Sequence, residues 1–169
     1  MGYKEHKARS LEQVRCAVLT VSDTRTRETD ESGGLIEELL KGGGHVVVAR
    51  HIVENDAGVI REWVKGLQGV QVVITTGGTG IGPKDVTIEA LSPLMEKELP
   101  GFGELFRSLS REEIGSGAIM TRSTAGVIDG IVVICLPGSL GAVSLAMSRI
   151  VLPEIGHMTG EVSKRYCDR

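Results

Sequence analysis

Hydrophobic residues along the chain form short apolar runs, separated by stretches in which they recur at helical spacing. The run Cys16–Val21 is apolar except for Thr20, a pattern typical of a strand buried on both faces of a parallel sheet. Further strands are predicted over His45–Val53 and Val70–Ile74. The chain is therefore expected to build a parallel sheet at its core.

Amphipathic stretches between these strands predict the helices that cover the sheet. The first helix is predicted to begin at the capping residue Ser32 and to end at the glycines 42–44. Two later helices are predicted over residues 86–95, where Pro93 disturbs the helix, and over residues 102–109.

The C-terminal third of the chain shows a different pattern. The apolar runs Thr121–Ile128 and Ile131–Leu136 flank Asp129-Gly130, a dipeptide typical of a tight β-hairpin turn. A long helix is predicted to follow the break at residues 136–139. This hairpin adds an antiparallel strand to the sheet.

Strands that alternate with helices predict right-handed β-α-β units. We therefore expect an α/β protein with a three-layer α-β-α fold, a mainly parallel sheet and one antiparallel hairpin strand. A chain of 169 residues is long enough for one domain with a sizeable core. We assign that domain to residues 13–169 and expect residues 1–12 to be a flexible polar tail.

The segment after the third strand is the main indication of function. It reads Thr75-Thr76-Gly77-Gly78-Thr79-Gly80-Ile81-Gly82-Pro83-Lys84-Asp85 and leads into a predicted helix. A glycine-rich turn before a helix brings backbone N–H groups close to an anion. The carboxylate of Asp85 at the exit of the turn suggests a phosphate group together with a divalent cation.

Two other predicted strands also end in small polar residues. The first ends in Ser22-Asp23 and the last in Pro137-Gly138-Ser139. Ligands of doubly wound sheets bind beyond the carboxyl ends of the parallel strands. We therefore expect these two ends and the glycine loop to line one site.

Known nucleotide motifs and the composition narrow the possible functions. Gly77 and Gly82 have P-loop spacing, but Pro83 stands where that motif requires Lys, and the loop holds no G-x-G-x-x-G fingerprint.

A net charge of −3 and 3% aromatic residues argue against nucleic-acid binding. No apolar run is long enough to span a membrane, and no signal peptide is recognised. Three cysteines without metal-site spacing fit a reducing cytoplasm.

Taken together, these motifs resemble the MoaB/MogA family of molybdenum cofactor biosynthesis proteins. The resemblance rests on the segments 75–80, 85–87 and 136–139. The MoaB branch is the most similar, through Thr20-Val21-Ser22-Asp23, Glu54-Asn55 and the segment 101–115. It implies a MogA-like molybdopterin-binding fold, and an activity in which the terminal phosphate of molybdopterin attacks the α-phosphate of Mg-ATP and releases pyrophosphate. It also implies a homo-oligomer, either a trimer or a hexamer.

The resemblance assigns roles to residues of this chain. Asp85 would hold Mg²⁺ and the transferring phosphate, and Glu54 or Asp56 could supply a further catalytic carboxylate. The binding residues would be Ser22, Asp23, Thr76, Gly77, Gly78, Thr79, Gly80, Pro137, Gly138 and Ser139. Each polar side chain also has a structural explanation, since Asp85, Asp56 and Ser139 could be helix caps and Asp23 could form an Asx turn.

One position departs from the MogA-type pattern, in which a Pro and an Asp follow the second strand. Here Asn55 stands where that Asp would align. Two functions of different class therefore stay open, an adenylyltransferase and a carrier that binds molybdopterin without chemistry. The related domain of nicotinamide-nucleotide-processing proteins is a more distant alternative, because the segment Ser22-Asp23-Thr24 differs from its pattern.

Overall fold

The computed structural model describes the backbone of residues 11–167 and the side chains of residues 11–164. Residues 1–10 of the predicted tail lie outside this range. The N–H group of Leu11 donates to the carbonyl of Gly156 at 3.1 Å, and Leu11 packs against the core. Leu11, within the predicted tail, is therefore part of the packed structure.

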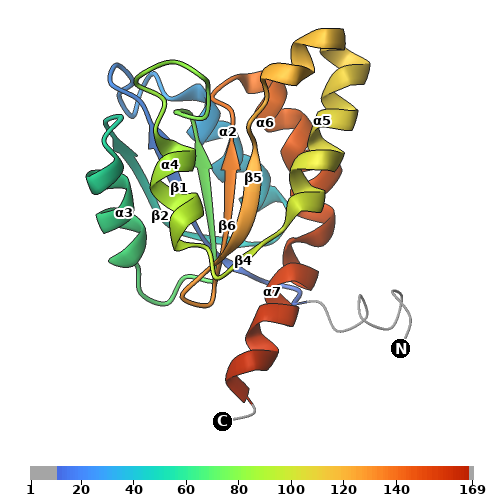
Figure 1. Ribbon diagram of the computed structural model, residues 1–169. Coiled ribbons are helices and arrows are strands. Elements are labelled where there is room, and N and C mark those ends of the chain that lie inside the picture. Colours follow the sequence, from blue (N-terminus) through green and yellow to red (C-terminus); the bar gives the residue numbers. More distant parts are fainter. Residues whose placement is uncertain (1–10, 168–169) are drawn as a thin grey trace.

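A six-stranded sheet in the order β2-β1-β3-β6-β5-β4 forms the middle layer (Figure 1). Neighbouring strands from β2 to β6 pair in parallel, whereas β5 and β4 are antiparallel to their neighbours. The strands are β1 (Arg15–Val21), β2 (Val46–Val53), β3 (Val72–Thr76), β4 (Lys97–Glu98), β5 (Thr124–Ile128) and β6 (Ile131–Leu136).

Helices cover both faces of this sheet, which confirms the three-layer α/β prediction (Figure 1). One face carries α3 (Ala57–Lys65) and the short helix α4 (Thr87–Leu91). The other carries α2 (Glu31–Gly42), α5 (Pro100–Ile114), α6 (Leu140–Ala146) and α7 (Leu152–Cys167), with a π-helical turn over Met147–Val151 between the last two. Among the described helices, none has both the length and the apolarity needed to cross a bilayer.

Strand β1 shows why a continuous apolar run was the right indication. Cys16 and Val18 pack into the core on one face of the sheet, while Ala17, Leu19 and Val21 pack into the core on the other. Successive side chains of a strand point to opposite faces, so burial of both faces favours an apolar residue at every position, and the one polar side chain, Thr20, is hydrogen-bonded to Asp30. Burial raises the pKa of the Cys16 thiol to about 12, which keeps this cysteine an inert core residue.

The hairpin prediction is also confirmed. Asp129 and Gly130 have φ angles of 49° and 78°, as a two-residue turn with two left-handed positions requires. The strand before the turn begins at Thr124 instead of Thr121. The edge strand β4 was not predicted, because a two-residue strand has no sequence period.

The predicted cap of the first helix is wrong, because Asp30 and not Ser32 occupies that position. The Asp30 carboxylate accepts a hydrogen bond from the N–H group of Gly33 at 2.9 Å. The helix predicted over residues 86–95 was expected to be disturbed at Pro93, and α4 indeed ends in a 3₁₀ turn over Ser92–Leu94 that contains this proline. Helix α5 extends beyond residues 102–109 at both ends.

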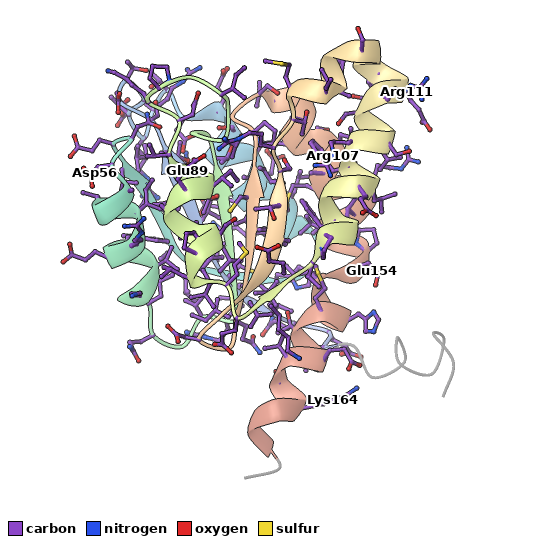
Figure 2. The ribbon with its side chains drawn as sticks, viewed as in Figure 1. Asp56, Glu89, Arg107, Arg111, Glu154 and Lys164 are labelled. Atoms are coloured by element: carbon purple, nitrogen blue, oxygen red, sulfur yellow. The ribbon has the colours of Figure 1, made fainter. Side chains whose placement is uncertain are left out.

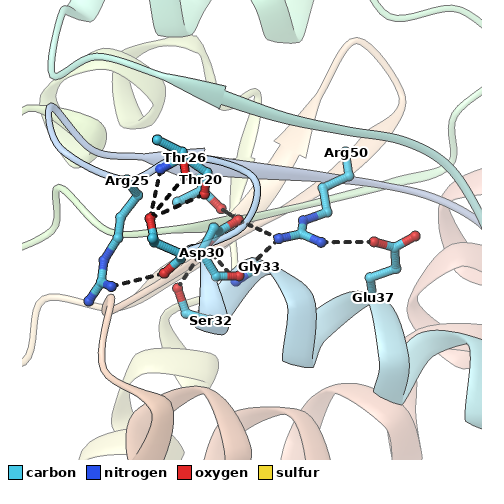
Figure 3. A network of polar contacts seen from close by, with 9 residues as sticks. Thr20, Arg25, Thr26, Asp30, Ser32, Gly33, Glu37 and Arg50 are labelled. Carbon is cyan, nitrogen blue, oxygen red and sulfur yellow. Dashed lines mark hydrogen bonds and ion pairs between the residues drawn. The ribbon is translucent and has the colours of Figure 1, made fainter.

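Asp30 is the centre of a buried polar network that joins β1, α2 and β2 (Figure 3). Its carboxylate accepts from the Thr20 hydroxyl at 2.8 Å and from the Arg50 guanidinium at 3.0 Å. Arg50 also donates to Glu37 at 3.2 Å. Burial on its own would raise the pKa of Asp30, but the hydrogen bonds from Gly33, Thr20 and Arg50 outweigh it and lower that pKa. The network fixes both ends of the loop from Ser22 to Thr29.

We expect Asp30→Asn to lower the free energy of unfolding at pH 7 by about 3 kcal/mol, because it leaves the Arg50 charge without its buried partner. A carboxylate whose pKa is lowered by folding stabilises the fold above its unfolded pKa of about 3.9, and this contribution is lost as the pH falls through the lower folded value. The difference between variant and wild type should therefore shrink below about pH 4. Urea unfolding at several pH values measures this difference. The control is Glu38→Gln, at an exposed position of the same helix, whose free energy of unfolding should stay within about 0.5 kcal/mol of wild type. A difference that is constant with pH would contradict the role of the charge.

Candidate functional site

The sheet has a topological switch point at β1, from which the chain proceeds first to β2 on one side and then to β3 on the other. Ligands of open α/β sheets bind in the crevice at such a point, beyond the carboxyl ends of the strands. The ends of β1, β3 and β6 are neighbours there, because β3 pairs with both other strands. The predicted convergence of three strand ends is therefore confirmed.

Gly77 is the residue at which the three strand ends touch. Its N–H group donates to the carbonyl of Leu136 at the end of β6, at 3.1 Å. A Cβ atom on Gly77 would lie 2.4 Å from the carbonyl oxygen of Val21, and one on Gly138 would lie 3.4 Å from the Gly77 Cα. With a φ of 92° as well, the position accepts only glycine without strain. The glycine loop can lie against β1 because it has no side chain here.

Three successive carbonyls of the glycine loop are bound on the side of helix α4. The Gly77 carbonyl accepts from the Thr87 hydroxyl at 2.9 Å, and the Gly78 carbonyl accepts from the Thr87 N–H group at 2.9 Å. The Thr79 carbonyl accepts from the Nε of Arg122 at 3.0 Å.

The opposite edges of these peptides carry the N–H groups of Gly78, Thr79 and Gly80. A trans peptide is planar, so each N–H group points away from the preceding carbonyl. Within residues 11–167, no hydrogen bond to a protein acceptor is formed by these three groups. Successive free N–H groups with a common orientation form an anion-binding concavity.

Asp85 closes the end of the loop but does not cap helix α4. One carboxylate oxygen, Oδ2, accepts from the N–H group of Gly82 at 3.0 Å, whereas the N-cap of α4 is Val86, without a side-chain hydrogen bond. Cβ atoms on Gly80 and Gly82 would lie 2.6 and 2.8 Å from that same oxygen. The carboxylate is therefore packed against the backbone of the glycine loop, beside the free N–H groups.

A second carboxylate, Asp23, lies at the end of β1. Its Oδ1 accepts from the N–H group of Asn55 at 2.8 Å and from the Asn55 side-chain amide at 3.1 Å. Its Oδ2 is 3.3 Å from the ammonium group of Lys84, the neighbour of Asp85. These donors, chiefly the Asn55 N–H group, lower the pKa of Asp23, so the carboxylate is charged at neutral pH. The Asn55 Oδ1 is buried without a hydrogen-bond partner in the described part of the chain.

The other two acidic candidates have different positions. Asp56 is the N-cap of α3 and accepts from the N–H group of Val59 at 2.9 Å, and Figure 2 shows it at the outer end of that helix. Glu54 is exposed just beyond β2. Asn55, between them, is the residue of this segment that contacts the strand-end site.

Three of the hydroxyl groups predicted to bind a ligand, those of Thr76, Ser139 and Ser22, have partners within the protein. The buried Thr76 hydroxyl donates to the Pro137 carbonyl at 3.0 Å, and Ser139 caps α6 by accepting from Ala142 at 3.4 Å. Ser22 accepts from the N–H groups of Thr24 and Arg25. The groups left to contact a ligand are therefore mainly backbone N–H groups and carboxylates.

The carboxylates at the site fit Mg²⁺ only if a ligand contributes oxygens. Among the described residues, no group of three or more His, Cys, Asp or Glu side chains could hold a metal ion. Mg²⁺ is commonly bound by one or two carboxylates together with substrate phosphates. Asp85 and Asp23 match that kind of donor set.

Two hollows of about 600 and 540 Å³ contain none of these residues. The first lies between α7 and the strands β4 and β5, and the second between α5 and the 3₁₀ segment η2 (Gly115–Met120). Cavity size and ligand-binding chemistry thus point to different places. The chemistry is the better guide here, because a phosphate group needs backbone donors and counter-charge more than a deep apolar cavity.

The sequence analysis gave no role in the site to Lys84, Thr87 or Arg122. Thr87 holds two loop carbonyls, Arg122 holds the third, and Lys84 pairs with Asp23. Lys84 and Thr87 are close in sequence to the glycines of the loop, so the candidate site could have been extended to include them. Arg122 comes from a distant segment, and no local pattern predicts its contact.

Comparison with known proteins gives a consistent result. Residues 17–157 match the model of a family described as a probable molybdopterin binding domain. Molybdenum cofactor biosynthesis protein B of Bacillus cereus is 50% identical over 98% of this chain and 100% of its own length. The protein of that name from Bacillus subtilis is also 50% identical, over 97% of this chain and 99% of its own.

Solved structures agree with the sequence relatives. A crystal structure of a molybdenum cofactor biosynthesis protein B superimposes with a TM-score of 0.87 at 51% identity, covering 90% of this chain and 97% of the other. The tungsten cofactor synthesizing protein MoaB of Pyrococcus furiosus gives a TM-score of 0.80 at 40% identity, covering 90% and 99% of the two chains.

We expect Gly77→Ala to lower the free energy of unfolding by about 3 kcal/mol or more, since a Cβ here meets the Val21 carbonyl and φ is positive. Gly101→Ala is the matched control, because a Cβ there meets nothing within 4 Å in the first turn of α5. It should be neutral or stabilising by up to about 1 kcal/mol. Denaturant unfolding of both variants measures the difference. A Gly77→Ala protein as stable as wild type would mean that the loop does not depend on its contact with β1.

Proposed function

We propose that this chain, which belongs to the MoaB/MogA family of molybdenum cofactor biosynthesis proteins, binds molybdopterin and adenylylates it with Mg-ATP. Membership of the MoaB branch places it in molybdenum cofactor biosynthesis. The transfer of AMP is the specific step that we add. The observation that carries it is the row of free N–H groups of residues 78–80 beside the Asp85 carboxylate.

Both halves of this arrangement support chemistry at phosphate. The three N–H groups would stabilise the negative charge of a phosphate group through hydrogen bonds from the fixed backbone, without a flexible charged side chain. The Asp85 carboxylate next to them would repel the same phosphate, unless a divalent cation lies between the two. A site that combines these groups favours a phosphate ligand that arrives with Mg²⁺ over a free anion.

The proposed reaction needs little acid-base chemistry from the protein. A terminal phosphate oxygen of molybdopterin attacks the α-phosphorus of ATP, forming one P–O bond, while the bond from that phosphorus to the bridging oxygen breaks. Pyrophosphate leaves with the electrons of the broken bond. The attacking phosphate oxygen carries no proton at neutral pH, so no general base has to be assigned. Transfer of this kind depends on positioning and charge neutralisation.

The roles of the residues follow from this scheme. Asp85, with Asp23, would hold the Mg²⁺ of Mg-ATP, and residues 77–80 would cradle a phosphate. The Pro137–Ser139 turn and Ser22 would form the remaining walls. Asp56 and Glu54, the other carboxylates expected from the sequence, have less support, because one caps a helix and the other is exposed.

A carrier that binds molybdopterin without chemistry is the alternative, and Asn55 is the observation that favours it. An amide at this position supplies donors to Asp23 but no negative charge for a metal ion. A carrier would bind molybdopterin tightly and form no adenylylated product. Incubation with molybdopterin and Mg-ATP, followed by chromatography of the pterin, separates the two functions.

We also propose that the chain assembles as a homo-oligomer, a trimer or a hexamer, as the resemblance implies. Three large apolar side chains at the junction of α5 and η2 are at least 52% exposed: Ile114, Ile119 and Met120. Such a cluster is unusual on a monomer surface and fits a face that a second copy covers. Sedimentation equilibrium measures the state.

We expect Asp85→Asn to lower the rate of AMP transfer at least about 100-fold, because it removes the charge that would hold the cation. The amide oxygen can still accept from Gly82, so the free energy of unfolding should change by less than about 1 kcal/mol. Asp129→Asn makes the same chemical change at the hairpin turn at the opposite end of the sheet, where Asn is well tolerated, and should keep the wild-type rate. Full activity of Asp85→Asn would exclude the catalytic role of this carboxylate.

We expect Asn55→Asp to make thermal stability depend on Mg²⁺. Without the cation, two carboxylates would lie about 3 Å apart where an amide now donates, so the protein should lose about 1–3 kcal/mol. With Mg²⁺, the pair can share a cation and much of this loss should be regained. Thermal unfolding of variant and wild type over a Mg²⁺ series measures the effect. An equal response of the two proteins would show that position 55 does not face the cation site.

A further inference from the structure

Arg122 connects the glycine loop to a part of the chain far away in sequence. It lies between η2 and β5, and its side chain is about one-third exposed. The Nε–H group donates to the Thr79 carbonyl at 3.0 Å. The Nη2 nitrogen donates to both carboxylate oxygens of Glu89, at 2.7 and 2.9 Å. Two of the three guanidinium nitrogens are thus used within the protein.

Glu89 gives this contact a fixed support. It lies on α4, the helix that follows the glycine loop (Figure 2). Burial would raise the pKa of Glu89, but the hydrogen bond and charge of Arg122 lower it, so the pair is ionised at neutral pH. A planar guanidinium held at two points has little freedom to rotate. The position of Arg122 relative to α4 is therefore well defined.

The position of the Thr79 carbonyl decides where the Gly80 N–H group points. Thr87 already holds the two preceding carbonyls, through its hydroxyl and its own N–H group. Thr87 has no further donor for the Thr79 carbonyl, which is held by Arg122 instead. Since the peptide is planar, fixing this carbonyl also fixes the N–H group on the opposite edge.

We propose that Arg122 is a positioning residue that aligns the Gly80 N–H group with those of Gly78 and Thr79, so that all three face one phosphate group. The role rests on the proposed function, in which this loop binds phosphate. Arg122 acts through the backbone and not as a direct phosphate ligand. A residue about forty positions away in sequence thus sets the affinity of the loop.

The test uses inorganic pyrophosphate with Mg²⁺ as the probe and the full chain as the protein. Calorimetry gives the dissociation constant, and NMR follows the amide signals of Gly78, Thr79 and Gly80. Arg122→Gln should raise the dissociation constant about tenfold, and the Gly80 signal should no longer move together with the other two.

Arg61→Gln is the matched control, because it removes the same charge from the other side of α4. Arg61 donates to the carbonyls of Ala90 and Glu89, and within residues 11–164 it forms no hydrogen bond or ion pair with the glycine loop. Its variant should bind pyrophosphate within about twofold of wild type. An equal loss of affinity in both variants would show that only the positive charge matters, and would overturn the positioning role.

Arg122→Lys keeps the charge and serves if Arg122→Gln fails to fold. One ammonium group lacks the planar fork that reaches the Thr79 carbonyl and both Glu89 oxygens together, so the affinity should again fall several-fold. Wild-type affinity in this variant would contradict the proposal.

If the wild type forms no adenylylated pterin but pyrophosphate moves all three amide signals, the proposed reaction fails and the role of Arg122 stands. If pyrophosphate moves none of them, the proposal fails whether or not AMP is transferred.

Discussion

The close contact between the Gly77 backbone and the Val21 carbonyl is the constraint on which the site depends. A Cβ atom would need to lie 2.4 Å from that oxygen, so only glycine allows the end of β3 to turn against the end of β1. The same residue receives the end of β6 through its N–H group. Three strand ends that are far apart in sequence become one surface because one side chain is absent.

From this contact the orientation of the loop follows step by step. Gly77 and Gly78 both have positive φ values, which turn the first two loop carbonyls toward Thr87. Arg122 continues the series at Thr79. The N–H groups that emerge on the opposite side belong to the backbone, which explains why the hydroxyl groups of Thr76 and Ser139 can be used within the protein. The site is polar without needing many polar side chains.

The sequence predicted those features that depend on neighbouring residues and missed those that depend on distant ones. Continuous apolarity over Cys16–Val21 reflects burial of both sheet faces, and Asp129-Gly130 defines its own turn, so both were read correctly. The cap at Asp30 was missed because Ser32 is an equally good capping residue. The ion pair with the partly buried Arg50 on β2 favours Asp30, and local sequence patterns do not reveal this contact. The contacts of Asn55 and Arg122 were missed for the same reason.

The segment after β2 shows how one position can separate binding from catalysis. Asn55 orients Asp23 with two hydrogen bonds, so it preserves the geometry of the strand end whatever its effect on charge. A carboxylate there would have to be neutralised by a proton or a cation, since two charged oxygens at this distance repel. The amide removes that requirement and makes the site stable without a metal ion. Under the proposed function the amide would lower the affinity for Mg²⁺, because the cation would then depend on Asp85, Asp23 and the phosphate oxygens that the ligand brings. Under the proposed function, an ordered empty site favours an amide at position 55, whereas tight metal binding would favour a carboxylate.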